Sequence, residues 1–260
     1  MLSMRMPVFE DLALIYDQTI DWEQRLAREI PFLSKIIQDN LNARILDLAC
    51  GSGRHAVALA AQGHEVTGLD LSPQMIEAAK HHAKEKGVVA QFSVADMRQV
   101  TVLLECPFDL IICLGNSLAL LPTLTDVQHT LADVHQLLTD GGSFVSQTLN
   151  FEEIHQTGFR FFPLKSGQTK NGKEVVFARF FEPEKTGESR LLVFLGITRA
   201  ESGWQPTFSS QPVLQLNKPI LESALQDAGF KHLVFYQDYN AQPFNPQQSR
   251  NLISIGTKKI

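Results

Sequence analysis

The sequence has few cysteines and no pattern among them that would build a metal site or a disulfide framework. Its three cysteines are Cys50, Cys106 and Cys113, and none has the short paired spacing of zinc sites and redox motifs. A small odd number of cysteines fits a reducing compartment. We therefore expect no metal site and no disulfide bonds, and we expect the protein to be cytoplasmic.

The sequence also lacks long apolar runs and an excess of positive charge. No apolar stretch approaches the roughly 18 residues of a membrane span, and acidic residues such as Asp17 and Glu23 near the start do not fit a signal peptide. The 23 Lys and Arg residues are outnumbered by 28 Asp and Glu, which gives a net charge of −5. Nucleic-acid binders usually carry a basic footprint. We expect neither a membrane nor a nucleic-acid partner.

What the sequence does contain is a glycine-rich turn inside the stretch Ile45–Ala56. An apolar run leads into the turn, and a helical pattern leads out of it. Gly51 and Gly53 allow the backbone to approach a ligand where a β-carbon would clash. Asp47 and Ala49 would lie beside them, where a strand ends and a helix begins, and open α/β sheets bind ligands at such an edge. Taken alone, the glycine spacing also fits a dinucleotide site.

Acidic residues follow each of the first three expected strands. A carboxylate at Asp47 would oppose a pyrophosphate but can attract the ammonium of S-adenosylmethionine, directly or through water. Asp70 can accept hydrogen bonds from both ribose hydroxyls, and Asp96 can accept one from the adenine amine. Leu71 and Met97 offer apolar faces for the ring. Each acid alone fits a helix cap equally well, but the three together favour a nucleoside site, and Asp47 favours S-adenosylmethionine over NAD.

The 260 residues are enough for one sizeable core with an inserted piece. Apolar runs alternate with helical patterns, which predicts βαβ units and a parallel sheet. The expected strands cover residues 44–50, 65–69, 88–94, 108–114 and 143–149, and the expected helices cover 54–62, 72–86 and 127–138. Asp140-Gly141-Gly142 should end the last of these helices. After residue 213, a helix from Asn217 to Gly229 and strands over 231–237 and 251–257 complete the core.

Two segments fall outside this alternation. Residues 8–38 carry apolar side chains along one helix face, including Phe9, Leu12, Tyr16 and Ile20, and Pro31 should kink or divide that helix. Residues 151–213 are rich in β-formers, and the strands expected over 173–181 and 190–198 resemble a hairpin with a turn over 182–188. Both faces of these strands are apolar, so both must be covered. The active-site mouth, a second subunit, or both would cover them.

Four motifs together resemble the class I S-adenosylmethionine-dependent methyltransferases. They are Asp47-x-x-x-Gly51-x-Gly53, Asp70, Ala95-Asp96-Met97 and Phe108-Asp109-Leu110-Ile111. The resemblance covers residues 40–150 and, more weakly, Asn217 to the end. It implies an α/β fold with a Rossmann-like, mostly parallel seven-stranded sheet and helices on both faces. The expected parts are an N-terminal helical cap (1–40), the core (41–150), an inserted antiparallel β lid (151–213) and the rest of the core (214–260).

Within this family, Cys113-Leu114-Gly115-Asn116-Ser117-Leu118-Ala119 and the β-rich insertion resemble small-molecule N-methyltransferases of the glycine and sarcosine type. That resemblance implies cofactor contacts from Leu114 or Asn116 and an N-terminal tyrosine that closes the pocket, for which Tyr16 is the candidate. We expect a small-molecule methyl acceptor, with an amine favoured over a hydroxyl or carboxyl group. The expected cofactor contacts are Tyr16, Asp47, Ala49, Gly51, Gly53, Asp70, Leu71, Met75, Ala95, Asp96, Met97, Leu114 and Asn116.

The cofactor would carry the difficult chemistry, an in-line displacement at the sulfonium, while the protein aligns the reactants. A neutral amine needs no strong base, whereas a hydroxyl acceptor would benefit from one, by about 10²–10⁴-fold. The candidates for direct roles are Tyr16, His155 as a base, and Arg160, with Arg179, as holders of a substrate carboxylate. A non-catalytic cofactor-binding protein and an NAD-dependent oxidoreductase are the alternatives. A homodimer through the insertion would cover its second face.

Overall fold

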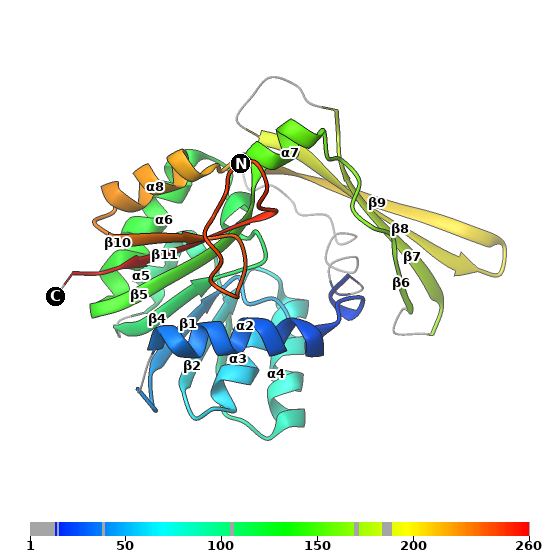
Figure 1. The fold of residues 1–260 in the computed structure, drawn as a ribbon. Helices are drawn as coiled ribbons and strands as arrows, with labels where there is room; N and C mark the ends of the chain where they lie inside the picture. Colours follow the sequence, from blue (N-terminus) through cyan, green and yellow to red (C-terminus); the bar gives the residue numbers. More distant parts are fainter. Residues whose placement is uncertain are drawn as a thin grey trace.

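Five parallel strands separated by helices form the centre of the molecule (Figure 1), in a computed structural model that describes residues 14, 16–37, 40–104, 107–168, 172–183 and 189–259. These strands are β1 (Arg44–Leu48), β2 (Glu65–Asp70), β3 (Gln91–Val94), β4 (Phe108–Cys113) and β5 (Leu138–Leu149). With the antiparallel strands β10 (Lys231–Tyr236) and β11 (Asn251–Thr257) they form a seven-stranded sheet, in the order β10-β11-β5-β4-β1-β2-β3. The expected α/β fold is confirmed.

Helices cover both faces of this sheet, as expected. One face carries α2 (Trp22–Ile37), α3 (Arg54–Ala60) and α4 (Pro73–Lys86), and the other carries α5 (Val100–Leu103), α6 (Leu124–Leu137) and α8 (Lys218–Asp227). The alternating side chains of β1 show both cores: Ile45 packs in the cluster of α2 and α3, whereas Leu46 packs in that of α6 and α8. A strand buried on both faces reads as a continuous apolar run, which is why the sequence pattern located it.

The glycine-rich turn lies where the strand order reverses. The chain leaves β1 toward β2 and β3, then returns to pair β4 along the opposite edge of β1. The loops that follow β1 and β4 therefore diverge and leave an opening between them. Ligands of open α/β sheets bind at this switch point, so the fold places residues 49–53 and 114–116 together at the expected ligand edge.

The N-terminal segment breaks at a different point from the one expected. The chain turns at residues 19–21, and α2 then runs from Trp22 through Pro31 without a break. The carboxylate of Asp21 accepts a hydrogen bond from the Gln24 backbone amide at 3.0 Å, so it caps a new helix at this position. The division expected at Pro31 is therefore wrong. Phe9 and Leu12 lie outside the described residues.

The start of β5 also differs from the expectation. The strand begins at Leu138, which pairs with Phe108 on β4, instead of at Ser143. The pairing shifts register before Leu110 resumes it opposite Ser143, and Gly141 has a φ of 80°. The Asp140-Gly141-Gly142 segment therefore follows the end of α6 as expected, but it forms an irregular part of the strand.

The insertion forms a second, four-stranded antiparallel sheet, which we call the lid sheet. It follows the short helix α7 (Phe151–Thr157) and contains β6 (Lys165–Gln168), β7 (Glu174–Phe181), β8 (Ser189–Ala200) and β9 (Gly203–Leu214), in that order. The β7–β8 hairpin confirms the expected one, although residues 184–188 of its turn lie outside the described residues. Neither α7 nor β6 and β9 was expected. Pro206 and Pro212 argue against a strand, but β9 is an edge strand, where proline is tolerated.

The two faces of the lid sheet have different surroundings. Val175, Phe177 and Phe181 point inward and are buried, and both phenylalanines belong to the same cluster as the core residues of α6 and α8. The opposite face carries Phe180, which is half-buried, and Phe208, which is 76% exposed. The sheet thus closes over the core with one apolar face, and the described residues cover its other face only in part. The domain boundaries given above stay predictions.

Candidate active site

The glycine-rich turn between β1 and α3 adopts a left-handed backbone at three positions, with φ values of 54° at Ala49, 56° at Gly51 and 72° at Gly53. This conformation costs alanine roughly 1–2 kcal/mol. A β-carbon on Gly53 would lie 2.6 Å from the β-carbon of Ala79, so glycine is required there. A β-carbon on Gly51 would meet no atom within 4 Å, so this glycine borders open space. The turn therefore combines a packed side with an open side that a ligand can approach.

Asp70 is fixed by backbone amides of the loops that follow β1 and β2. Its Oδ2 accepts a hydrogen bond from Gly51 at 2.9 Å, and its Oδ1 accepts one from Ser72 at 2.8 Å. The helix cap of α4 is Ser72 itself, whose hydroxyl accepts from the Met75 amide. Asp70 is therefore not the cap, and its carboxylate is held at the strand end. Beside it, Leu71 is 40% exposed, as an apolar platform for an adenine ring would be.

Asp96 has the more ordinary role that its sequence position also allowed. Its carboxylate accepts from the Arg98 backbone amide at 3.0 Å and caps the short 3-10 helix at residues 97–99. The Arg98 guanidinium also pairs with it at 2.6 Å. Contact between Asp96 and an adenine amine stays a prediction.

Asp47 is the buried acid of the site, with 2% of its surface exposed. Burial, together with the charge of Asp70, raises the pKa of Asp47 to about 8. Its Oδ2 has no hydrogen-bond partner among the described residues. A buried carboxylate oxygen without a donor is costly, and a cationic group entering the opening would supply one. The ammonium of S-adenosylmethionine fits this requirement.

Arg25 is a site residue that the sequence analysis missed. It projects from α2, with its Nε 2.9 Å from Glu29 Oε1 and its guanidinium carbon 4.9 Å from the Trp22 ring centroid. A β-carbon on Gly115 would lie 3.9 Å from Arg25 Nη2. Arg25 also acts electrostatically on Asp47. Its guanidinium therefore lies between the two diverging loops, although its spacing to Glu29 resembles an ordinary pair on a helix surface.

His55 holds the other oxygen of Glu29. Its Nε2 lies 2.5 Å from Glu29 Oε2, and its ring packs edge-on against Trp22. Burial lowers the pKa of His55. Burial alone would raise the pKa of Glu29, but hydrogen bonding to His55 and the charge of Arg25 bring it below its usual value. His55 thus helps to position Arg25, because it holds the Glu29 carboxylate with which Arg25 pairs.

Ser52 ties the N-terminal segment to the glycine-rich turn. Its hydroxyl donates to Asp17 Oδ1 at 2.7 Å, and its carbonyl accepts from His82 Nδ1 at 2.8 Å. His82 is half-buried on α4, so its ring can reach this carbonyl. Because Asp17 adjoins Tyr16, this hydrogen bond joins the glycine-rich turn to the part of the N-terminal segment that carries Tyr16.

The loop after β4 is braced by β5. Gly115 donates its amide to Gln147 Oε1, and Asn116 donates its amide to the Gln147 carbonyl, at 3.0 and 2.9 Å. The side-chain oxygen of Asn116 accepts from the Leu149 amide at 2.9 Å. Since that oxygen is engaged, a contact from Asn116 to a ligand would come from its side-chain nitrogen. Among the other expected cofactor contacts, Ala95 and Leu114 are buried, and Met75 and Met97 are half-buried.

Tyr16 connects the cap to the lid sheet. Its ring centroid lies 5.3 Å from that of Phe177, and the guanidinium carbon of Arg179 lies 4.2 Å above it. Arg179 also lies 4.5 Å from the Phe162 ring. Burial lowers the pKa of Arg179, and among the described residues no carboxylate is paired with it. A partly desolvated guanidinium without an acid is a ready partner for an anionic ligand.

The other two catalytic candidates lie elsewhere. His155 is exposed on α7. Arg160 donates from Nε to the Phe181 carbonyl at 3.1 Å, and its guanidinium covers Phe161, which is 65% exposed. These contacts favour Arg179 over Arg160 as the holder of a substrate carboxylate. The assignment itself stays a prediction.

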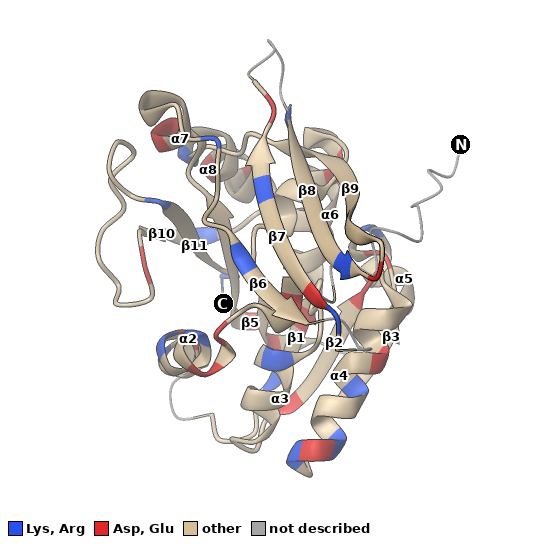
Figure 2. Ribbon diagram, turned by 90° about the vertical axis from the view of Figure 1, so that its right-hand side faces the viewer, with Lys and Arg blue, Asp and Glu red and all other residues tan. Residues whose placement is uncertain are grey.

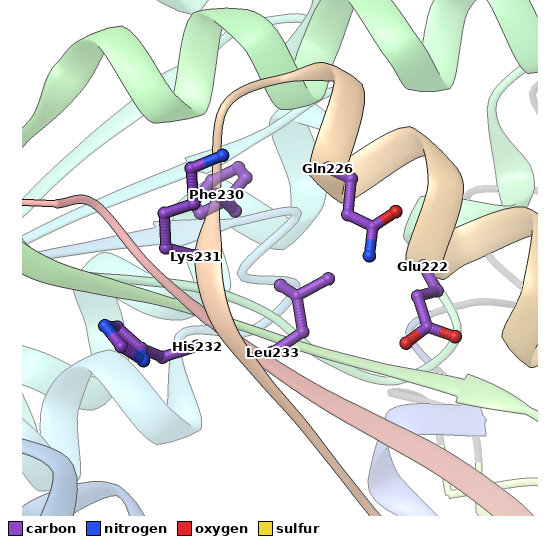
Figure 3. Close-up of a pocket in the computed structure, with 6 residues that line it drawn as sticks. All are labelled: Glu222, Gln226, Phe230, Lys231, His232 and Leu233. Atoms are coloured by element: carbon purple, nitrogen blue, oxygen red, sulfur yellow. The ribbon is translucent and has the colours of Figure 1, made fainter.

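A separate cavity of about 490 Å³ lies between α8 and β10 (Figure 3). Glu222, Gln226 and Lys231 are among its lining residues. The strands β11, β5 and β4 separate β10 from β1, so this cavity is not part of the opening at the glycine-rich turn. Within the described part of the chain, no three His, Cys, Asp or Glu side chains gather as metal ligands, and no helix has the length and apolarity to cross a membrane.

Residues 45–142 match a family model described as "Methyltransferase domain". Among curated relatives, the glycine/sarcosine N-methyltransferase of Aphanothece halophytica is 29% identical over 229 residues, which cover 86% of this chain and 80% of that protein. The enzyme of the same description from Parasynechococcus marenigrum is 27% identical over 242 residues, which cover 91% of this chain and 80% of that protein.

Solved structures resemble the whole chain. An S-adenosylmethionine-dependent methyltransferase from Clostridium acetobutylicum superposes with a TM-score of 0.76 at 17% identity, covering 97% of this chain and 99% of that one. An amino pentose methyltransferase from Micromonospora echinaspora, solved with S-adenosylmethionine bound, superposes with a TM-score of 0.70 at 20% identity, covering 98% of both chains. At these identities the likeness shows the fold, including the part beyond residue 142.

Proposed function

We propose that this chain, which belongs to the class I S-adenosylmethionine-dependent methyltransferases, transfers a methyl group to the nitrogen of a small amine that carries a carboxylate. The methyltransferase domain and the curated relatives establish the enzyme class and its cofactor, in place of the NAD alternative. The observation that carries the acceptor class is Arg179, a half-buried guanidinium beside Tyr16 with no ion pair among the described residues.

Four side chains and the glycine-rich turn would hold the cofactor. Asp70 would accept the ribose hydroxyls, and Leu71 would lie against the adenine. Asp47, with its unpartnered oxygen, would meet the ammonium. Arg25, held by Glu29 near Gly115, would bind the cofactor's carboxylate. When bound, S-adenosylmethionine supplies an electrophilic methyl group on a sulfonium.

The chain's own residues then position the acceptor and exclude water. Arg179 would hold the acceptor's carboxylate and thereby aim its amine, and Tyr16 and Phe177 would form the wall between cap and lid. Alignment of this kind can contribute about 7–11 kcal/mol to lowering a barrier. A neutral amine attacks without a strong base, which agrees with the exposed position of His155.

Activity is tested with labelled S-adenosylmethionine and a panel that separates the acceptor classes. Glycine and sarcosine represent amines with a carboxylate, ethanolamine and methylamine represent amines without one, and catechol represents hydroxyl acceptors. We expect label to appear on the carboxylate-bearing amines, with one demethylated cofactor per transfer. Transfer to catechol alone, or to the simple amines as readily as to glycine, would contradict the proposed acceptor. Cofactor binding with no transfer to any acceptor would favour the non-catalytic alternative.

We also propose that two copies pair through the outer face of the lid sheet. The outward side chains of β7 and β8 include Phe180, Val193 and Leu195, and Phe208 on β9 lies opposite Leu195. A second copy offers the same apolar side chains, which suits a twofold interface. We expect a dimer in analytical ultracentrifugation and a monomer for Leu195→Lys, while Val102→Lys, at an exposed apolar position on α5, leaves the dimer intact. A monomeric wild type would refute the pairing.

The cytoplasmic location, the independence from metal and the absence of a nucleic-acid partner remain predictions from composition. The independence from metal is tested by measuring activity after exhaustive chelation, which we expect to leave activity unchanged. Loss of activity on chelation and its recovery with a divalent ion would contradict that prediction.

A further inference from the structure

A second cation lies beside Arg179 on the lid sheet. Lys165 on β6 pairs with Phe177 on β7, and Arg179 follows Phe177 on the same face of that strand. Both cations face the ring of Tyr16: the guanidinium carbon of Arg179 lies 4.2 Å from the ring centroid, and Lys165 Nζ lies 5.6 Å from it. Figure 2 shows basic positions on both strands. The lid thus forms one wall of the candidate acceptor site, and this wall carries two positive groups.

Among the described residues, these two cations have less negative charge near them than Arg25 has. Arg25 is paired with Glu29 at 2.9 Å. Lys165 donates to the Thr19 carbonyl at 3.0 Å, a contact with a neutral oxygen that leaves two of its three donors. Asp21 is the acid whose charge favours the protonated form of Lys165, while burial and the charges of Arg179 and Arg25 together lower the pKa of Lys165. Positive charge therefore exceeds negative charge at this wall.

Adjacent like charges destabilise one another unless an anion lies between them. An acceptor with one carboxylate would engage Arg179 and leave Lys165 uncompensated. Arg25 is no alternative partner for a second acceptor anion, because its position between the diverging loops, beside Gly115 and within the field of Asp47, puts it at the cofactor's end of the opening. The arrangement has one more cation than a glycine-like acceptor needs.

We propose that the natural acceptor is an amine with two anionic groups, such as a dicarboxylic amino acid, and that Lys165 binds the second anion while Arg179 binds the first. This inference rests on the proposed function, because it takes the acceptor to bind against Tyr16. In the reaction the amine's lone pair forms the new nitrogen–carbon bond, and the carbon–sulfur bond breaks. Its electrons stay on sulfur as a neutral thioether, and the amine's proton passes to solvent.

The test compares acceptors that share an α-amine and differ in the second carboxylate: glycine on one side, aspartate and glutamate on the other. We expect kcat/KM of the wild type to be at least about tenfold higher for one of the dicarboxylic acids than for glycine, the range of one charge-assisted hydrogen bond. Lys165→Met should remove that preference and leave kcat/KM for glycine within about twofold, because glycine makes no contact with Lys165. Lys165→Arg should restore part of the preference, since it keeps the charge.

The outcomes separate this inference from its alternatives. If Lys165 only ties the lid to the cap through Thr19, Lys165→Met will lower kcat/KM for all acceptors together, which overturns the inference. Transfer to glycine or sarcosine without a preference for a second carboxylate overturns it too, yet leaves the proposed function standing. Transfer to no amine at all overturns both.

Arg199→Met is the matched control. Arg199 is a cation of the same sheet, its side chain is 68% exposed, and it lies 4.0 Å from Glu174. We expect this variant to keep the wild-type ratio between the acceptors. A midpoint of thermal unfolding within about 2 °C of that of the wild type would show that Lys165→Met is folded.

Discussion

The opening above β1 and β4 and the inner wall of the lid sheet face the same space but are built from different interactions. Above β1, backbone hydrogen bonds fix the acids: Gly51 and Ser72 hold Asp70 at 2.9 and 2.8 Å. In the lid, rings and cations make the contacts, with Phe177 and Arg179 at 5.3 and 4.2 Å from Tyr16. Hydrogen bonds to backbone amides are strongly directional, whereas ring contacts tolerate a range of geometries.

This difference explains how one fold can combine a constant methyl donor with varied acceptors. The family model covers residues 45–142, which form most of the core and include no residue of the lid. A change above β1 should therefore abolish cofactor binding, whatever the acceptor. A change in the lid should alter acceptor use and leave cofactor binding intact. Three substitutions test this division, in order of decreasing effect.

The largest effect is expected for Asp70→Asn. Asparagine keeps one acceptor oxygen and replaces the other with a donor, so the change breaks one of the two backbone hydrogen bonds that shape the turn and weakens the ribose contact. Hydrogen bonds to a charged group are worth about 1.5–3 kcal/mol each, so we expect the dissociation constant of the cofactor to rise roughly 100-fold. Isothermal titration with S-adenosylhomocysteine measures it.

Glu77→Gln is the control for this change. It neutralises a carboxylate on α4 whose side chain is 72% exposed and pairs with Lys80. Exposed pairs contribute at most about 1 kcal/mol, so cofactor affinity should stay close to that of the wild type. An Asp70→Asn variant that binds the cofactor as tightly as Glu77→Gln does would refute the site assignment.

A smaller and more selective effect is expected for Arg179→Met, the counterpart in the lid. Methionine keeps the apolar contact with Tyr16 and Phe162 but cannot bind a carboxylate. We expect KM for a carboxylate-bearing acceptor to rise about 30-fold, with the cofactor's dissociation constant unchanged within twofold. Steady-state kinetics with each substrate varied in turn measure both constants.

Arg160→Met decides between the two arginines that the sequence left open. Arg160 donates to the Phe181 carbonyl, so its loss should affect lid stability more than acceptor KM. If Arg160→Met raises KM and Arg179→Met does not, the roles of the two residues are reversed. If both variants weaken cofactor binding, the division between core and lid is wrong.

The sequence predicted the core well because its signals are local. A strand buried on both faces, a glycine where only a left-handed backbone fits and an acid at each strand end all lie within short windows around Asp47, Gly53 and Asp70. The parallel order then follows from connection rules. The glycine-rich turn was located for this reason, and so was the helix α4, which Ser72 caps.

The lid and the cap were harder to predict because their signals are tertiary. Which face of β7 meets the core depends on pairing with segments far along the chain, and the prolines of β9 are tolerated only because it lies at the edge. Arg25 resembled a surface pair with Glu29, since nothing local reveals the Gly115 loop nearby. Asp96 shows the opposite case: its strand-end position was predicted, yet its carboxylate already has Arg98 as a partner.

The smallest effect expected concerns the protonation of Asp47. Folding raises the pKa of Asp47 to about 8, mainly through burial, so the unliganded protein holds this carboxyl largely protonated at pH 7. A cofactor ammonium favours the carboxylate form. Binding at pH 7 must therefore release a proton, and cofactor affinity should be about tenfold lower at pH 7 than at pH 9. Asp47→Asn should bind more weakly and lose this part of the pH dependence, while any titration of the cofactor itself is common to both proteins.

Stability of the unliganded protein provides an independent check on the same carboxyl. Because the folded-state pKa lies above the unfolded value of 3.8, the folded protein binds the proton more tightly, and this contribution to stability is lost as pH rises through about 8. Wild type should therefore lose stability relative to Asp47→Asn between about pH 4 and pH 8, by at most about 1.4 kcal/mol per pH unit. Denaturant unfolding at several pH values measures the difference. If the difference in unfolding free energy between the two proteins does not change with pH, Asp47 is ionised in the free protein. The core would then carry its ligand-binding charge before the cofactor binds, as the lid does.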